Sequence, residues 1–596
     1  MERGSAIMKI MFFSPFSAIW QHAFPEALVA NSLFDDNEIL YLACDGELGA
    51  GCMSMFAHQL TEKSNSHERE NVCNNCRQQR NLLTEALNVK PAFIKDYISN
   101  EEMSLVESLL SGIQKTTPDK FYYEGFPFGR YALHETIIHY KLTNLSEMDE
   151  EEFSDFCNNL KNVLIVFFAI KHYVAEHNPD RVVTYNTHVS TQYTVMNFCE
   201  SQGIPVYGLH AGMNMACRLQ SLYVFRQDMR VFYNRLIQNF EKSLSDEPCD
   251  KEGLENVARH FLSLCQGRNT FVYSAPKSKS HFDLHDFFSV KAGQKVLLAT
   301  MSSYDEFFSS ETLGVHEEVR LLFPKQVDWI KSVVDYVAGR PDLFLIIRVH
   351  PREFPNKREN RLSNHAKLLE EEWKKGLPDN VVVNSPTDNI SIYDLAMETD
   401  VVLNGWSSVG KEMSLLGIPV VIYNSDILYY PGKILNYLGD TKESYFEKIE
   451  KALSDGWSFD RAIKTFRWLA WEYTYATLDI SDGYPRRELS EVSIASRIWG
   501  RLSRFMNPQG EQKNDCKRLK RIDLSQKHLF VQAIMEGGFV PDLQWSGRES
   551  LSESEEKVLI AHLLRRIVRG AYSDSNAMTS MLVRKINKAV DEILAR

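Results

Sequence analysis

The sequence predicts an α/β fold with two lobes whose parallel sheets face a cleft, followed by a helical C-terminal extension. Three observations lead to this prediction. Short apolar runs that end in polar residues alternate with helical patterns. This alternation stops and starts again around residues 275–293, and the sequence after residue 524 shows helical periodicity only. A chain of 596 residues is also too long for one core, and roughly two to four domains are expected.

The first half of the chain contains two β-α-β patterns. In the second of them, Gly203 follows the predicted helix and Pro205 precedes the next strand, which is the usual order of these residues at such a junction. The predicted strands cover residues 9–15, 38–44, 180–186 and 204–212. Helical patterns cover residues 82–113, 149–177 and 219–267, and the polar segment 61–79 is predicted as a loop.

The second half repeats the alternation. Its predicted strands cover residues 294–307, 343–351, 380–386, 400–408 and 418–424, with a long helix at residues 326–338 and helical sequence from residue 459 onward. We therefore expect three segments: an N-terminal lobe (residues 1–275), a C-terminal lobe (276–500) and a helical extension (501–596).

Composition and charge limit the classes of function. The net charge of −12 argues against nucleic acid as a partner. Residues 1–30 lack the ordered features of a secretory signal, and the longest apolar run, residues 163–170, is far shorter than the ~20 residues that span a bilayer. We expect a cytoplasmic protein. The basic segment 513–527 is either a contact for acidic lipid head groups at the inner face of the membrane or a solvated helix face.

The stretch "NGWSSVGKE" places small and hydroxyl-bearing residues between a predicted strand and a predicted helix. Free amides at the helix start, with the hydroxyls of Ser407 and Ser408 beside them, could bind phosphate, and Gly410 would allow a close approach to the backbone. The alternative is an ordinary strand-turn-helix corner. The spacing of the Walker phosphate-binding loop is absent.

Arg348 and His350 end another predicted strand of the same sheet. Because ligands of open parallel sheets bind at the carboxyl ends of the strands, we expect both side chains to face the crevice that Ser407 and Ser408 line. Pro351 favours an extended conformation at His350, which directs the ring away from the strand end. An arginine beside a histidine can bind phosphate, and the histidine can donate a proton to a leaving group.

The motifs "RVHP" and "SSVGKE…GIPVV" resemble those of the two-lobed (GT-B) Rossmann-like glycosyltransferases of bacterial capsule and surface-polysaccharide biosynthesis, which are related to Kdo transferases with His-Pro and Ser-Ser motifs. The stretches "MSSYDEF" and "YNTHVS…GIPVYGLHAG" resemble further elements of that group. The resemblance is scattered over residues 9–471 and does not cover the last hundred or so residues.

The resemblance implies a nucleotide-sugar donor in the C-terminal lobe and a polysaccharide or lipid-linked glycan acceptor in the N-terminal lobe. It implies that His350 binds the donor phosphate, with Asp305 and Glu306 at the edge of the cleft. The whole donor and phosphate-binding set that it implies is Ser302, Ser303, Arg348, His350, Ser407, Ser408, Gly410, Lys411 and Glu412. The chain departs from the family pattern at Thr187-His188 and at His210-Ala211-Gly212.

A sugar transfer with inversion needs a group that takes the proton of the acceptor hydroxyl. Asp45, His188 and His210 lie at the ends of predicted strands of the N-terminal lobe and are the candidates there, and Glu306 and His350 are the catalytic candidates of the C-terminal lobe. The sequence does not decide among them, nor between inversion and retention. No metal is required if helix-end amides, Arg348 and His350 carry the phosphate charge, and no Asp-x-Asp follows a predicted strand.

Cys44, Cys52, Cys73 and Cys76 are four of the ten cysteines and lie near one another in the sequence. The last two have the C-x2-C spacing of a zinc site, whereas the first two are too far apart for that motif. They are either ligands of a structural zinc or free thiols.

Other functions remain open at this stage. A teichoic-acid-type glycerophosphotransferase or a sugar-nucleotide epimerase would use a similar pair of lobes, and a non-catalytic sugar-nucleotide-binding protein could serve an assembly complex. The amphipathic tail, residues 553–594, could form an oligomer contact.

Overall fold

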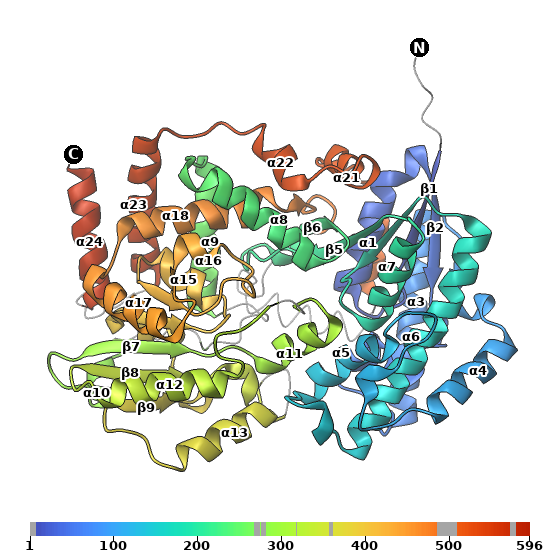
Figure 1. Ribbon diagram of the computed structural model, residues 1–596. Coiled ribbons are helices and arrows are strands. Elements are labelled where there is room, and N and C mark those ends of the chain that lie inside the picture. The colour runs from blue at the N-terminus through green and yellow to red at the C-terminus, as the bar shows by residue number, and fades with distance from the viewer. Residues whose placement is uncertain are drawn as a thin grey trace.

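The structure is a computed structural model that describes residues 7–267, 275, 282–316, 319–356, 361–485, 509–571 and 580–595. It contains a sheet of seven strands and a sheet of six strands. We call the part built on the seven-stranded sheet the first lobe and the part built on the six-stranded sheet the second lobe; they lie side by side in Figure 1.

The sheet of the first lobe has the order β13-β6-β5-β4-β1-β2-β3. Strands β1 to β5 are parallel to one another, β6 is antiparallel to β5, and β13 is antiparallel to β6. The strands are β1 (Met8–Phe13), β2 (Asn37–Ala43), β3 (Pro91–Phe93), β4 (Arg181–Tyr185), β5 (Val206–Ala211), β6 (Ser221–Arg226) and β13 (Leu478–Asp479).

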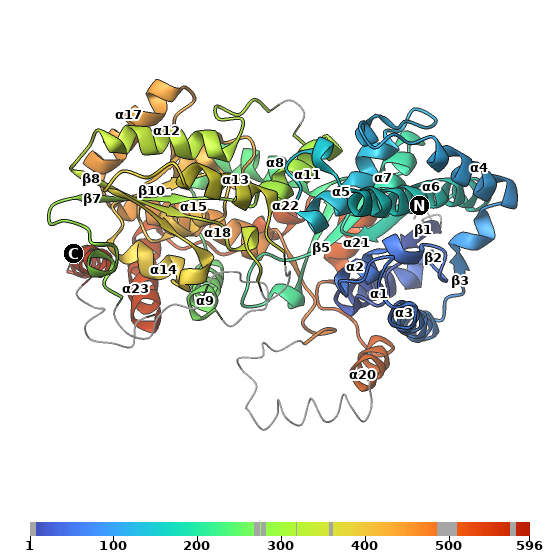
Figure 2. The same ribbon diagram turned by 90° about the horizontal axis from the view of Figure 1, so that it is seen from below.

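Helices cover both faces of this sheet, as Figure 2 shows for β1 and β2. Met11 and Phe13 pack toward one layer, whereas Ile10 and Phe12 pack toward the other, so β1 is buried on both sides. This is why its sequence is apolar without alternation. One layer contains α4 (Asn100–Ser111), α5 (Phe128–Tyr140), α6 (Glu150–His177) and α7 (Ser190–Ser201), and the other contains α1 (Trp20–Leu33), α2 (Met53–Ala57) and α3 (Ser66–Leu87).

The sheet of the second lobe is wholly parallel and has the order β12-β11-β10-β7-β8-β9. Leu297 and Leu345 face one helical layer, and Leu298 and Ile346 face the other. The strands are β7 (Lys295–Thr300), β8 (Leu343–Arg348), β9 (Val381–Asn384), β10 (Val401–Asn404), β11 (Val420–Ile422) and β12 (Tyr437–Leu438). Helix α8 (Met229–Lys242) packs on β6 of the first lobe. The helices that follow it are α9 (Lys251–Gln266), α10 (Leu284–Phe288), α11 (Tyr304–Leu313), α12 (Gln326–Ala338), α13 (Asn364–Trp373), α14 (Ile392–Leu395), α15 (Val409–Leu415), α16 (Gly432–Leu435), α17 (Lys442–Asp455) and α18 (Phe459–Ala470). The predicted α/β class with two lobes is therefore confirmed.

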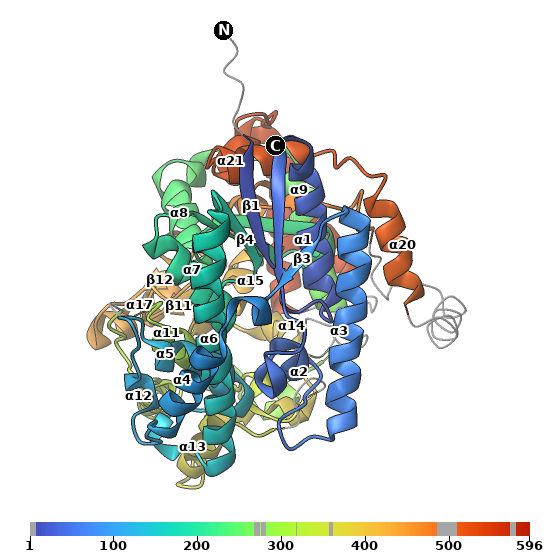
Figure 3. The same ribbon diagram turned by 90° about the vertical axis from the view of Figure 1, so that its right-hand side faces the viewer.

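The chain returns to the first lobe after α18. A π-helical turn, Trp471–Tyr475, leads to β13, which pairs with β6 at the edge of the first sheet. Helices α20 (Gly510–Leu519) and α21 (Lys527–Met535) then pack on α1, and α20 also packs on α3, as Figure 3 shows. The C-terminal region thus contributes to the first lobe although it follows the second lobe in sequence.

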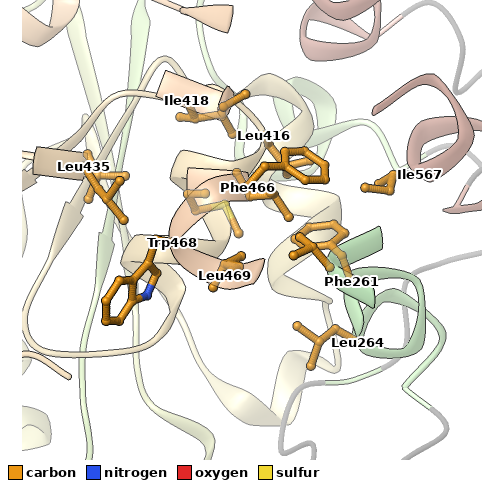
Figure 4. Close-up of a cluster of buried hydrophobic side chains, with 14 of the residues drawn as sticks. Phe261, Leu264, Leu416, Ile418, Leu435, Phe466, Trp468, Leu469 and Ile567 are labelled. Carbon is orange, nitrogen blue, oxygen red and sulfur yellow. The ribbon is translucent and has the colours of Figure 1, made fainter. Parts of the chain in front are cut away.

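The last helices pack on the second lobe. After α22 (Val540–Trp545), helix α23 (Glu553–Ala571) lies against α9 and α24 (Met581–Leu594) lies against α23. In the buried cluster of Figure 4, Ile567 of α23 lies near Phe261 of α9 and Phe466 of α18. The extension is helical as predicted. Most apolar residues of the tail expected to form a subunit contact are buried inside this fold, whereas Val558 and Leu594 are exposed. The segment boundaries and the oligomer stay predictions.

Three predicted elements differ from the structure. The segment 61–79, predicted as a loop, lies largely in α3, whose first turn is capped by the Asn65 side chain accepting from the His67 N–H. Its many Glu, Arg and Gln residues favour helix, but its low apolar content hid the periodicity. The predicted helical ranges 82–113 and 219–267 also contain the strands β3 and β6, which are short and pair only through long-range contacts.

The apolar run of residues 163–170 lies within α6. This helix is long and apolar enough to cross a membrane by length and composition, but 67% of its most apolar 18-residue window is buried inside the protein. It packs against α5, α7 and α4, so the fold accounts for its apolar sequence.

Candidate functional site

Two cavities lie side by side between the lobes. Cavity A, of about 220 Å³, is formed at the carboxyl ends of β7 and β8 and by the turn before α15. It is closed from the other side by Met213 and Met215, which follow β5 of the first lobe, and by α9. The residues that line cavity A are Met213, Met215, His260, Leu264, Thr300, Met301, Arg348, Val349, His350, Pro351, Ile392, Tyr393, Ser407, Ser408, Val409, Lys411, Glu412 and Tyr473. The predicted meeting of Arg348 and His350 with the serine pair is thus observed.

Arg348 carries the charge of cavity A. Its side chain is buried, and its Nη1 donates to the amide oxygen of Asn384 at 2.5 Å. No carboxylate in the described ranges lies within ion-pair distance of this guanidinium. Burial lowers its pKa to about 10, partly opposed by the charge of Asp388, so the group remains a cation at neutral pH. A buried cation without an anionic partner is costly, and a bound anion would remove that cost.

His350 lies next to this guanidinium in the wall of cavity A. Its Nδ1 accepts the N–H of Arg352 at 3.3 Å, so the proton of the neutral ring is on Nε2. Burial lowers the pKa of His350, with the neighbouring carboxylates of Glu306 and Glu353 opposing the shift. The ring is therefore a neutral N–H donor at pH 7. Such a group can hydrogen-bond a phosphate oxygen and transfer its proton to it.

Glu412 places a carboxyl group in the wall of the same cavity. Its Oε1 accepts from the Ser408 hydroxyl at 2.8 Å and its Oε2 accepts from the Tyr393 hydroxyl at 2.9 Å. Burial raises the pKa of Glu412, against the hydrogen bonds from these hydroxyls. The cavity thus combines a cation, an N–H donor and a carboxyl, which suits a ligand that bears both phosphate and hydroxyl groups.

The turn at Gly410 differs in detail from the expected phosphate loop. The backbone amides of its first helical turn are already bonded within the turn: those of Val409, Gly410, Lys411 and Glu412 donate to the Ser407 hydroxyl or to the carbonyls of Ser407 and Ser408. A Cβ added at Gly410 would lie 2.1 Å from the hydroxyl of Tyr430 and 2.6 Å from Nδ2 of Asn404. Glycine is therefore needed here because protein side chains approach the backbone. Ser407 and Ser408 line the cavity, and the amides of Val409 to Glu412 are not free to bind a ligand.

Lys411 lies in the wall between cavity A and a second cavity. It is buried and its Nζ lies 2.6 Å from Oε2 of Glu472, in the π-helical turn after α18. Glu472 also accepts from the Tyr233 hydroxyl at 2.9 Å. The charge of Lys411 is therefore balanced by the protein.

Cavity B, of about 280 Å³, is shared by the two lobes. Residues after β4 and on β5 of the first lobe face aromatic residues of the second lobe across it. Its lining residues are Asn186, Thr187, His188, His210, Met213, Phe225, Met229, Tyr233, Trp406, Ser408, Lys411, Tyr429, Tyr430 and Glu472. Met213, Ser408 and Lys411 line both cavities, so A and B are adjacent.

Two histidines of the first lobe face cavity B as neutral rings. His210 Nδ1 lies 2.8 Å from the carbonyl oxygen of Ala211, which can only accept, so the lone pair is on Nε2. Burial, aided by the charge of Arg218, lowers the pKa of His210 to about 3. Burial also lowers the pKa of His188, and its Nε2 and the hydroxyl of Thr187 are buried with no hydrogen-bond partner in the described part of the chain. These atoms point to a polar ligand in cavity B.

Of the "MSSYDEF" residues, Met301 lines cavity A, and the others lie beside the cavities and not in their walls. Ser302 accepts the Trp406 N–H at 2.9 Å, and the Ser303 hydroxyl donates to Asp305 at 2.7 Å. Asp305 lies 3.0 Å from Arg352 and Glu306 lies 2.8 Å from it. Burial, together with neighbouring carboxylates and against the charge of Arg352, raises the pKa of Asp305 to about 7. These residues fix the strand-to-helix turn before α11.

Arg352 is a residue that the sequence analysis missed. It follows His350 in "VHPRE", and its Nη2 donates to the carbonyl of Ile138 in α5 at 3.2 Å. Because its own N–H also holds His350, it links the wall of cavity A to the first lobe, where α5 packs on α11 (Figure 1). Its nearness to the His-Pro motif in the sequence was the available signal.

In its ion pairs within the described part of the chain, Asp45 contacts none of the residues that line cavities A and B. It lies at the end of β2, where it forms ion pairs with Arg77, Arg80 and Lys95 at 3.4, 2.9 and 2.5 Å. Burial is outweighed by the hydrogen bonds from Lys95 and Arg80, which lower the pKa of Asp45. Asp45 lines neither cavity A nor cavity B.

The four cysteines of the expected zinc site are Cys44 and Cys52, on the loop after β2, and Cys73 and Cys76, on α3. Burial raises the pKa values of the Cys44, Cys52 and Cys76 thiols. Within the described ranges, no group of three or more His, Cys, Asp or Glu side chains is arranged to hold a metal ion. The thiols therefore do not fit a metal centre in this conformation, and the zinc site stays a prediction.

Comparisons with known proteins give little beyond the fold. No protein-family model matches the chain, and no curated protein matches it. Solved structures with similarity include KpsC of Thermosulfurimonas dismutans, a β-Kdo 2,4 transferase, at 15% identity over 49% of this chain and 80% of that chain, with a TM-score of 0.31.

Two further solved structures are similar at comparable levels. The UDP-GlcNAc 2-epimerase of Methanocaldococcus jannaschii is 11% identical over 78% of this chain and 98% of its own, with a TM-score of 0.26. The spinosyn rhamnosyltransferase SpnG with thymidine diphosphate is 10% identical over 80% and 98%, with a TM-score of 0.24. These scores are too low to support an argument about activity. The chain's own sheets and cavities define its class: an α/β protein with two Rossmann-like lobes that face a cleft.

Proposed function

We propose that this protein is a glycosyltransferase that moves a sugar from a nucleotide-activated donor to a growing surface polysaccharide or glycolipid, without a catalytic metal. The observation that carries the proposal is Arg348. It is a buried guanidinium without a carboxylate partner in the described ranges, and it lies in a cavity that adjoins a second cavity lined by neutral histidines.

Cavity A suits the donor. The phosphate groups would bind at Arg348 and at Nε2–H of His350, and the sugar or ribose hydroxyls would bind at Glu412 and Ser408. The carboxyl of Glu412 already accepts from two hydroxyl groups, which is the interaction that a diol would offer it.

Cavity B suits the acceptor. Its aromatic walls, formed by Trp406, Tyr429 and Phe225, offer flat apolar faces for the C–H face of a sugar ring. The Nε2 atoms of His188 and His210 lie in the same wall region and can accept a hydroxyl proton.

In the proposed transfer, bond formation, bond cleavage and proton transfer each use a group of this arrangement. The acceptor oxygen bonds to the anomeric carbon while the bond from that carbon to the phosphate oxygen breaks. The hydroxyl proton passes to a histidine Nε2 of cavity B, and the leaving phosphate keeps the electron pair of the broken bond. Arg348 and His350 stabilise the charge of that phosphate, and His350 can return a proton to it.

The second cavity separates this proposal from its main alternative. An epimerase acts on one sugar nucleotide and needs space for one substrate, whereas a transferase needs adjoining sites for two. The contact of cavities A and B through Ser408 and Lys411 therefore favours transfer. A glycerophosphotransferase would also use two sites, but its nucleotide donor would carry a glycerol group in place of the transferred sugar.

The fate of the donor tests the proposal. The purified protein is incubated with UDP-, GDP-, CMP- and dTDP-sugars and with glycan acceptor mixtures, and 31P and 1H NMR follow the nucleotide and the sugar. A transferase releases free nucleotide only when acceptor is present, and an epimerase changes the sugar while the nucleotide stays attached. Retained binding without turnover of any donor would indicate the non-catalytic binding protein instead.

We also propose a structural zinc, which does not take part in the transfer. Elemental analysis of the purified protein tests it.

We propose that the protein is cytoplasmic and contacts the inner face of the membrane. Cell fractionation and vesicle sedimentation test this location. In the structure, the basic segment exposes Lys513, Lys517, Lys520 and Arg521, whereas Asp515 is buried and accepts from Trp20 Nε1 at 2.8 Å.

A further inference from the structure

A third cavity opens between the two lobes, beyond the two that the proposed reaction uses. Cavity C has a volume of about 650 Å³ and lies between the outer face of α8 and two loops of the second lobe. Tyr430 lines both cavity B and cavity C, so the two cavities adjoin at this residue. The residues that line cavity C are Arg230, Asn234, Ile237, Gln238, Glu241, Gly314, Val315, His316, Val319, Ser425, Asp426, Tyr430, Gly432 and Lys433.

Arg230 places an incompletely neutralised cation in cavity C. Its Nη1 donates to the carbonyl oxygen of Leu428 at 2.8 Å, and its guanidinium carbon lies 5.3 Å from the centre of the Tyr429 ring. In the described ranges, no carboxylate forms an ion pair with it. Burial lowers the pKa of Arg230, although the nearby charges of Asp426 and Asp228 oppose this shift. An anion placed against this group would gain a charge-assisted hydrogen bond.

His316 adds an unsatisfied polar atom to the same cavity. The residue is 5% exposed, and its Nδ1 is buried without a hydrogen-bond partner in the described part of the chain. The ring stacks on Phe307 with centroids 5.6 Å apart. Burial, and after it the charge of Arg230, lowers the pKa of His316 to about 4. When the proton of this neutral ring is on Nδ1, that atom can donate a hydrogen bond to an anion, and Arg230 beside it would attract the same anion.

The rest of the cavity is polar. Asn234 and Gln238 follow Arg230 at intervals of four residues on α8, so their amide groups line one stripe of the helix. Lys433 and Asp426 are exposed and Glu241 is partly exposed, so the acidic groups lie toward solvent. The deeper pair, Arg230 and His316, is therefore the anion-selective part of a cavity whose amides suit sugar hydroxyls.

We propose that cavity C is a binding subsite for an anionic group, a carboxylate or a phosphate, which Arg230 and His316 hold together. Under the proposed function, this group is a substituent of the acceptor chain that extends from cavity B past Tyr430. A free small anion could bind Arg230 and His316 in the same way. The experiment below distinguishes it from a substituent of the acceptor chain. Recognition of the anion itself does not depend on the transfer reaction.

Calorimetric titration with three probes tests the subsite in the absence of nucleotide. The probes are trigalacturonic acid, its neutral methyl ester and inorganic phosphate. We expect the acidic trisaccharide to bind and the ester to bind at least tenfold more weakly. Arg230→Gln should lower the affinity for the acidic trisaccharide at least tenfold. Arg235→Gln is the matched control, because Arg235 lies on the same helix but contacts Asp542 and the Phe539 ring, and should change nothing.

The outcomes distinguish the sources. Phosphate binding that Arg230→Gln abolishes, with no binding of the trisaccharide, identifies a free anion as the ligand. Equal binding of acid and ester, equal binding by the wild type and Arg230→Gln, or no binding of any probe overturns the proposal. Nucleotide binding is measured separately in cavity A, so its failure would leave this result intact.

A second readout uses His316 directly and covers the case in which Arg230→Gln does not fold. In protein labelled with 13C at the histidine Cε1 position, the signal missing from His316→Gln identifies this ring. We expect its pKa to rise when the probe that binds is added, because a bound anion stabilises the imidazolium. An unchanged titration in the presence of a saturating probe contradicts contact between His316 and the anion.

Discussion

Lys411 and Glu472 form a buried ion pair, with Nζ 2.6 Å from Oε2, in the wall between cavities A and B. Lys411 comes from the turn of the "SSVGKE" motif, and Glu472 comes from the π-helical turn through which the chain returns to the first lobe. The pair therefore joins the wall of cavity A to the crossover between the lobes. This geometry gives Lys411 a structural role in addition to its place in the wall of both cavities.

Removing one partner of this pair should destabilise the protein strongly. Lys411→Met leaves Glu472 buried without its cation, and we expect a loss of about 3–5 kcal/mol in the free energy of unfolding. Chemical denaturation measures this loss. The matched control is Lys451→Met, which breaks the exposed pair with Asp455 and should cost less than about 1 kcal/mol. Equal effects of the two substitutions would contradict a structural role for the Lys411–Glu472 pair.

Substitutions of the two histidines of cavity B should distinguish a role in acceptor binding from a role in proton transfer. His210→Asn keeps a donor near the carbonyl of Ala211 but removes Nε2, and His188→Asn removes the other Nε2. We expect one of the two variants to lose about 10²- to 10⁴-fold in kcat with unchanged nucleotide affinity. The other should change mainly the KM for the acceptor. Full kcat in both variants would exclude histidine as the base in cavity B.

The turn at Gly410 should tolerate a side chain only if its neighbour is shortened. Gly410→Ala directs a Cβ to within 2.1 Å of the Tyr430 hydroxyl, and we expect a destabilisation of about 1–3 kcal/mol from overpacking. The double variant Gly410→Ala/Tyr430→Phe should recover part of it, because the nearest atom is gone. Thermal denaturation of the three variants checks this. No recovery would mean that Asn404, the next neighbour, is the main obstacle.

The buried carboxyl of Glu26 should make stability depend on pH. It lies on α1, accepts from Tyr185 N–H at 2.8 Å and from the Ser14 hydroxyl, and burial raises its pKa from 4.5 to about 8 despite these bonds. The folded protein therefore holds a proton that the unfolded chain loses above pH 4.5, so this contribution to stability decreases as the pH rises from about 4.5 to 8. Glu26→Gln should flatten the decrease in Tm over this range. An unchanged slope in the variant would contradict the raised pKa.

The strands of both sheets were predictable because burial on two faces leaves continuous apolar runs, as in β1, β8 and β10. The short strands β3 and β6 were missed, since their pairing depends on partners far away in the sequence. The polar helix α3 was missed because its low apolar content gives little periodicity.

The site was predictable where it follows strand ends. Arg348, His350, Ser407 and Ser408 meet as expected, because the carboxyl ends of parallel strands lie at one edge of a sheet. The sequence could not show that Glu472 balances Lys411, that Tyr430 occupies the space beside Gly410, or that Arg230 reaches the cleft. Each depends on packing between segments that are distant in the chain.

Nucleotide binding at Arg348 is the most direct test of the account. Thermal unfolding is followed with UDP, GDP, CMP, dTDP and their sugars, for the wild type, Arg348→Gln, His350→Ala and the surface control Arg340→Gln. A ligand at a hundredfold excess over its Kd should add about 2.7 kcal/mol of stability. We expect a rise in Tm with one nucleotide class that is lost in Arg348→Gln and His350→Ala and kept in Arg340→Gln. No rise with any nucleotide, in a protein that unfolds cooperatively, would contradict it.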